Sequence, residues 1–187
     1  MSLVQLAEQP FELLLELERR ARAAVAAREG KRSAVDEWVG IGFRLGAEHF
    51  VTGRGDVREI LPVPEQITRV PGAKPWLRGI ANLRGQLLTV VDLKAFLGGG
   101  GPPADRRARL LIAASRDVPT GLIVDEVVGF RRFAADDFRP DMPATVIRCE
   151  HYLDGCYRRG AETWPRFSLH KLLADEQFLN AGEMMKA

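Results

Sequence analysis

The stretch Gly79-Ile-Ala-Asn-Leu-Arg-Gly85, followed directly by Gln86-Leu-Leu-Thr-Val-Val-Asp-Leu93, decides the fold class. Two apolar segments meet at Asn82 and Gly85, and asparagine and glycine both tolerate the backbone angles of tight turns. The pattern therefore predicts two β-strands joined as a hairpin, with Arg84 at its tip. Asp92 is expected to cap a short helix that begins directly after the second strand.

Similar segments continue on both sides of this hairpin. Short apolar runs separated by glycine and proline are expected to be strands at 38–45, 49–52, 57–61, 110–114, 122–128, 152–157 and 163–167. A terminal helix is expected over 169–179, with Ser168 as its N-cap. Many short strands with glycine and proline turns favour an all-β sandwich or barrel over a parallel α/β sheet.

The N-terminal residues have a different pattern. Apolar side chains in 11–28 follow helical spacing, which predicts an amphipathic helix. This helix is expected either to cap the domain or to bind a partner. The chain is accordingly divided into a helical extension with a linker (1–34), a β domain (35–179) and a tail (180–187).

Composition limits the class of protein. The chain has 187 residues, of which 46% are apolar and 28% charged, and a net charge of only +2. These values are ordinary for a globular domain, and the charge balance gives no electrostatic footprint for nucleic acid. The N-terminus lacks a positively charged signal region, and no apolar run reaches the ~18 residues that span a bilayer. A cytoplasmic protein is expected.

Two features resemble ligand sites without matching them. The glycine run at 98–101 is followed by Pro-Pro rather than Gly-Lys, so a plain loop is favoured over a phosphate cradle. Cys149, His151 and Cys156 match no standard zinc spacing, so buried cysteines are favoured over a zinc site unless a distant histidine completes it.

Charged residues give no catalytic set either. Asp125 and Glu126 are adjacent in an expected strand and would face opposite sides, so a solvated or turn-bonding Asp125 is favoured over acid–base catalysis. The basic runs 106–109 and 131–132 are expected to be solvated. A binding protein without metal, cofactor or enzymatic activity is predicted; an oligonucleotide-binding barrel and a zinc or cofactor-dependent enzyme stay open as alternatives.

The hairpin motif, closing in Val90-Val-Asp-Leu93, resembles the Gly-x-x-Asn-x-Arg-Gly and Asp-Leu pattern of CheW-like chemotaxis coupling proteins. Further segments that resemble the family are Val57-Arg-Glu-Ile60, Pro71-Gly-Ala-Lys-Pro-Trp76, Gly121-Leu-Ile-Val-Asp-Glu-Val127 and Tyr152-Leu-Asp-Gly155. In order, they cover about residues 37 to 173. The N-terminal helix and the segments 70–76 and 164–170 are similar to the branch of the family that serves type IV pili.

The resemblance implies a fold and a function. The fold is mainly β, with a pair of five-stranded SH3-like barrels around a shared core, an N-terminal helix and a short C-terminal helix. The function is a non-catalytic adaptor that couples chemoreceptors to a CheA-type histidine kinase, in the pathway for type IV pili and twitching motility. A flagellar-type coupling protein is the alternative.

The resemblance also implies partners and positions. The positions implied for the regulatory domain of the kinase are Val57, Glu59 and Gly79. The positions implied for the cytoplasmic tip of a methyl-accepting chemoreceptor are Asn82, Arg84 and Gly85. Neither nucleic acid nor direct membrane insertion is expected, and the cytoplasmic adaptor is expected to be recruited to membrane-associated receptor arrays.

Overall fold

A computed structural model describes residues 37–100, 106–115 and 119–181. The helix predicted over 11–28 lies outside these residues. The chain divides into two units, Met1–Glu37 and Trp38–Ala187, and the description below concerns the second. The domain boundaries assigned from the sequence stay a prediction.

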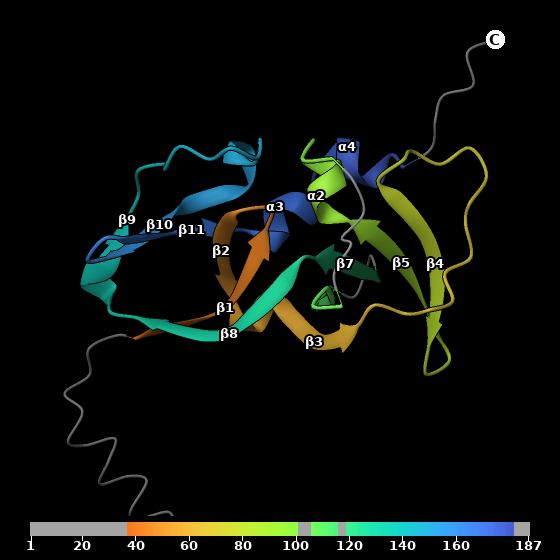
Figure 1. The fold of residues 1–187 in the computed structure, drawn as a ribbon, viewed down its shortest axis with the longest axis horizontal. Coiled ribbons are helices and arrows are strands. Elements are labelled where there is room, and N and C mark those ends of the chain that lie inside the picture. The colour runs from red at the N-terminus through yellow and green to blue at the C-terminus, as the bar shows by residue number, and fades with distance from the viewer. Residues whose placement is uncertain (1–36, 101–105, 116–118, 182–187) are drawn as a thin grey trace, which may run out of the picture. The chain divides into compact units, whose positions relative to one another are not determined.

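The described chain is mainly β and forms two sheets (Figure 1). One sheet has six strands in the order β8-β1-β2-β11-β10-β9. Its strands are β1 (Trp38–Leu45), β2 (Glu48–Gly53), β8 (Glu126–Phe133), β9 (Phe138–Arg139), β10 (Leu153–Arg159) and β11 (Glu162–Phe167). The extra strand relative to the expected five is β9, which is two residues long.

The other sheet has five strands in the order β3-β6-β7-β5-β4. Its strands are β3 (Val57–Pro62), β4 (Leu77–Leu83), β5 (Gln86–Asp92), β6 (Arg109–Ala113) and β7 (Thr120–Val124). Short helical segments connect the strands or follow them: η1 (Arg54–Asp56), α2 (Leu93–Phe96), η2 (Ala135–Asp137), η3 (Glu150–Tyr152), α3 (Leu169–Leu173) and α4 (Glu176–Leu179).

Strand β1 follows its sequence pattern but is buried on both faces. The alternating Ile41, Phe43 and Leu45 enter the core between the sheets. The glycines between them face the other side, where a Cβ on Gly42 would come within 2.8 Å of a Val128 methyl group. The glycines therefore allow tight packing on the second face of the strand.

The apolar interior consists of three clusters, one shared by the two sheets and one within each sheet. The largest contains residues of both sheets, for example Phe43, Phe50, Leu111 and Leu122, so it is the shared core that was expected. The five-stranded sheet curls around a second cluster that includes Leu88 and the residues Ala81, Val90, Leu110, Ile112 and Ile123. The six-stranded sheet encloses an aromatic cluster of Phe133, Tyr157 and Trp164.

The strand predicted over 122–128 is in fact two strands. It breaks at Asp125, where β7 of the five-stranded sheet ends and β8 of the six-stranded sheet begins. The prediction of one strand was wrong because apolar residues flank Asp125 and Glu126 on both sides, so the two acids read as positions within one strand. The chain thus leaves the six-stranded sheet through η1, after β2, and returns to it at Asp125.

The C-terminal helix is also divided. Ser168 caps α3 as predicted and accepts a hydrogen bond from the Lys171 N–H. The helix ends at Ala174, and Asp175 caps the separate helix α4. Asp175 also accepts a hydrogen bond at 2.7 Å from the Tyr152 hydroxyl; burial, reinforced by this carboxylate, raises the pKa of Tyr152. In the described ranges, no helix is long and apolar enough to cross a membrane.

Candidate partner-binding surface

The predicted hairpin is present and its turn is tight. Strands β4 and β5 pair up to Leu83 and Gln86, which leaves Arg84 and Gly85 as a two-residue turn. Both turn residues have positive φ, 52° and 84°, as a type I′ turn requires. Asn82 was expected to supply an unusual backbone angle, which is wrong: its side-chain Oδ1 accepts the Gly85 N–H at 2.9 Å and stabilises the turn from outside.

Arg84 extends from this rigid tip into solvent. Its side chain is 78% exposed, and its Nη2 lies 2.9 Å from Oε1 of Glu59, which is 33% exposed. The ion pair joins Glu59, a position that the family resemblance implies for kinase binding, to Arg84, a position that it implies for receptor binding. These two sets of positions therefore meet at one point of the surface.

The contact is a consequence of sheet curvature. Glu59 is in β3 and Arg84 follows β4, and these strands are the two edges of the five-stranded sheet. A second contact, from Arg58 Nη2 to Gln86 Oε1 at 3.0 Å, joins β3 to the start of β5 beside the same hairpin. Exposed pairs of this kind contribute ~0–1 kcal/mol, so their main effect is to orient the side chains.

Val57 and Gly79 have structural roles that Glu59 and Arg84 lack. Val57 is 9% exposed and belongs to the shared core. Gly79 has φ of 137°, and a Cβ at this position would lie 2.1 Å from the Thr68 carbonyl oxygen. Gly79 thus allows the bridge in which Thr68 and Ile80 exchange backbone hydrogen bonds of 2.8 and 2.9 Å.

Beside Val57 and Glu59 lies a shallow hollow of about 270 Å³. Phe130 of β8 forms part of its wall, and its side chain is 62% exposed. Phe130 was not predicted from the sequence, because the expected strand ended at Val128. No local signal marks it: its place beside the hollow depends on the pairing of β8 with β1.

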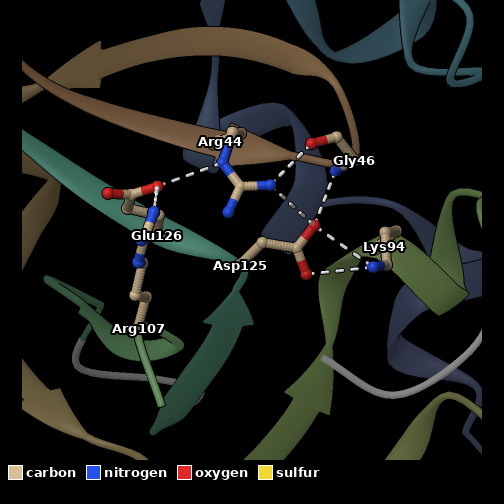
Figure 2. A network of polar contacts seen from close by, with 6 residues as sticks. All are labelled: Arg44, Gly46, Lys94, Arg107, Asp125 and Glu126. Carbon is tan, nitrogen blue, oxygen red and sulfur yellow. Dashed lines mark hydrogen bonds and ion pairs between the residues drawn. The ribbon is translucent and has the colours of Figure 1, made fainter. Parts of the chain in front are cut away.

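The two sheets are clamped together where β7 passes into β8 (Figure 2). Asp125 is 6% exposed. Its Oδ2 accepts the Gly46 N–H at 2.6 Å, and both its oxygens lie 3.0 and 3.1 Å from Lys94 Nζ. Arg44 Nη1 lies 3.9 Å from Oδ2. The expectation of a solvated Asp125 was wrong, whereas bonding to a turn is confirmed.

Glu126 continues this network on the other side of the strand. Its Oε2 accepts a hydrogen bond from Arg44 Nε at 3.1 Å and lies 3.9 Å from Arg107 Nη1 (Figure 2). Both acids are therefore engaged by cations. Their environment is that of a structural clamp between α2, β1 and the strand crossing.

The cysteines are part of the interior. Cys149 and Cys156 are 1% and 0% exposed. Burial raises the pKa of the Cys149 thiol to about 11 and also raises that of Cys156. Within the ranges that the structure describes, no three His, Cys, Asp or Glu residues are grouped as a metal would require.

We expect neither thiol to react with Ellman's reagent in the folded protein at neutral pH, because only exposed thiolates are nucleophilic. Unfolding in guanidinium should make both reactive. The measurement is thiol release at 412 nm as a function of time. Rapid reaction of one thiol in the native protein would show that its surroundings open readily.

Comparisons with known proteins agree with this architecture. The family model for the CheW-like domain matches residues 39–177. This chain belongs to the CheW-like family. PilI of Pseudomonas aeruginosa is 38% identical over 94% of this chain and 97% of its own length. The chemotaxis protein CheW of Klebsiella aerogenes is 25% identical over 78% of this chain and 87% of its own.

A solved CheW-like structure has the same fold. The scaffolding protein TtCheW of Thermoanaerobacter tengcongensis matches 75% of this chain and 90% of its own, with a TM-score of 0.65 and 26% identity. CheW-like proteins are non-catalytic scaffold and coupling proteins of chemosensory signalling. The predicted resemblance and the mainly β two-sheet fold are therefore confirmed.

Proposed function

We propose that this chain is a cytoplasmic, non-catalytic adaptor that couples methyl-accepting chemoreceptors to a CheA-type histidine kinase. The observation that carries the proposal is the exposed Arg84 at a rigid hairpin tip, held beside Glu59. A planar guanidinium at such a position offers two parallel hydrogen bonds to a partner carboxylate or to the carbonyls at a helix end.

The kinase regulatory domain binds the surface that begins at Glu59. Val57 and Gly79 shape this surface from beneath, through the core and through the backbone bridge to Thr68. The adjacent hollow with Phe130 offers an aromatic anchor of the kind that dominates protein interfaces. Kinase contact thus combines the charge of Glu59 with a hollow that Phe130 and two arginines, Arg54 and Arg58, line.

The receptor tip binds the hairpin, where Asn82 and Gly85 fix the position of Arg84. The adaptor thereby raises the effective concentration of kinase at receptor arrays, and it links two binding events through one ion pair. The pathway is the control of type IV pili and twitching motility; the identity of 38% to PilI supports this assignment. No cofactor, nucleic acid or membrane insertion takes part.

Replacing Arg84 with glutamate should reduce receptor-dependent control of kinase activity by at least about tenfold. The assay reconstitutes receptor, kinase and adaptor and follows phosphate transfer. The control is Arg158→Glu, because Arg158 is another exposed arginine with an acidic partner, Asp141, but lies in the six-stranded sheet. Unchanged coupling with Arg84→Glu would overturn the role of Arg84.

The double variant Glu59→Arg with Arg84→Glu separates two explanations. It preserves an internal ion pair with the charges exchanged. Because Glu59 is itself proposed to contact the kinase, receptor binding is measured without the kinase. If the receptor binds the positive charge on the hairpin, receptor binding stays lost. If the pair only orients the hairpin, receptor binding returns, and the proposed contact with the receptor is wrong.

A further inference from the structure

A second charged site lies at the opposite end of the five-stranded sheet. It is a cavity of about 620 Å³ under the loop that connects β3 to β4. Arg78 lies near the start of β4, whereas the Arg84 hairpin lies beyond its end. The cavity is therefore separate from the proposed kinase and receptor surfaces, and Figure 1 shows β4 running between the two ends.

Four arginines and one acidic residue, Glu65, line this cavity. The arginines come from three separate segments: the β3–β4 loop, strand β4, and the start of β6 with the residues just before it. They are Arg69, Arg78, Arg106 and Arg109. Like charges gathered in this way repel one another, so an anionic occupant would be favoured.

Most of these arginines are not engaged. Arg109 Nη1 donates to the carbonyls of Arg106 and Ala108 at 2.9 and 2.8 Å. Within the part of the chain that the structure describes, the guanidinium groups of Arg69, Arg78 and Arg106 form no hydrogen bond or ion pair. Unengaged guanidinium donors of residues that line one cavity are available to a ligand.

One neighbouring carboxyl is already committed elsewhere. Asp92 is 1% exposed and accepts the Ala95 N–H at 3.0 Å as the cap of α2. Burial raises the pKa of Asp92, and the nearby Arg78 opposes this rise. The arginine thus stabilises Asp92 at a distance while its own donors stay free.

The remaining lining of the cavity is apolar. It includes Pro62, Pro64, Ile67 and Ile123. A volume of several hundred cubic ångströms with apolar walls and a few convergent polar groups is typical of small-molecule sites. The lining therefore suits a ligand that has both a flat apolar part and a compact cluster of negative charge.

We propose that this cavity binds a small molecule with adjacent phosphates and a ring system, of the nucleoside diphosphate class. Guanidinium forks match phosphate oxygens in pairs, and two adjacent phosphates place several charges in a small volume. An extended acidic peptide spaces its same-face carboxylates ~7 Å apart, so it neutralises converging arginines less well. The proposal is independent of the coupling function, which does not require the cavity.

The test is calorimetric titration of the full chain with ADP, inorganic pyrophosphate, adenosine and tetraglutamate. ADP should bind most tightly, pyrophosphate more weakly and adenosine not at all. The variant Arg69→Gln/Arg78→Gln should weaken ADP binding at least about tenfold, because it removes two charge-assisted hydrogen-bond donors to phosphate. The control Arg148→Gln/Arg158→Gln removes the same charge away from the cavity and should change binding less than about twofold.

Several outcomes would overturn the proposal. They are no ADP binding at millimolar concentration, equal loss in both variants, adenosine binding as tightly as ADP, or tetraglutamate binding more tightly than pyrophosphate. Circular dichroism and urea unfolding of both variants ensure that loss of binding is not loss of folding. The titration does not measure kinase coupling. A negative result here therefore leaves the proposed role of Arg84 standing, and a negative result for Arg84 leaves this proposal standing.

Discussion

Replacing Asp125 with alanine is expected to lower the free energy of unfolding by about 3 kcal/mol. The change leaves Lys94 Nζ, whose side chain is only 16% exposed, and the Gly46 N–H without the carboxylate that binds them. A buried charge that loses its partner keeps its desolvation cost and loses its compensation. Urea unfolding at neutral pH, followed by circular dichroism, measures the effect.

The matched control is Asp141→Ala. Asp141 also forms an ion pair, with Arg158, but their side chains are 51% and 47% exposed. We expect a loss of about 1 kcal/mol or less, because solvent screens this pair. Asp125→Asn should fall between the two alanine variants, since it retains an acceptor for the Gly46 N–H. Equal effects of Asp125→Ala and Asp141→Ala would mean that the clamp is not holding the sheets.

Replacing Gly79 with alanine is expected to cost about 3 kcal/mol of unfolding free energy. The added Cβ would lie 2.1 Å from the Thr68 oxygen, and the backbone at φ of 137° is strained for any residue with a Cβ. Relief requires the β3–β4 loop to move away from β4. Thermal and urea unfolding report the loss.

Gly72→Ala is the control for Gly79→Ala. Gly72 also has positive φ, 67°, but a Cβ added there would meet no atom within 4 Å. Only the backbone preference is lost, so we expect a cost of about 1 kcal/mol. If Gly79→Ala weakens kinase binding without loss of stability, Gly79 contacts the kinase directly. If stability and binding fall together, its role is to shape the surface.

The local parts of the fold could be predicted from the sequence. Strand β1 and the β4–β5 hairpin have the period-two pattern and turn residues that specify them, and Asp92 and Ser168 cap helices as expected. The division at Asp125 could not be predicted, because apolar residues flank it on both sides, at 122–124 and 127–128. A change from one sheet to another is set by distant partners rather than by local pattern.

The candidate site was predictable to a similar degree. The sequence places Arg84 at the hairpin tip, and the structure agrees. The sequence offers no reason to pair Arg84 with Glu59, because the contact requires the five-stranded sheet to curl until its edges meet. Phe130 and the arginine-lined cavity depend on the same long-range arrangement. Contacts between separate segments were missed, whereas short motifs were found.

The path of the chain has one further consequence. The five-stranded sheet is an insertion between β2 and β8, the two neighbours of β1 in the other sheet. All six residues proposed for kinase and receptor lie inside this insertion. The host sheet can therefore change in sequence while the inserted module retains these six residues, provided that the sites of entry and exit and Phe130 of β8 are kept. Asp125, at the exit, joins the two modules, because its carboxylate binds Gly46 of the host sheet and Lys94 of the insertion.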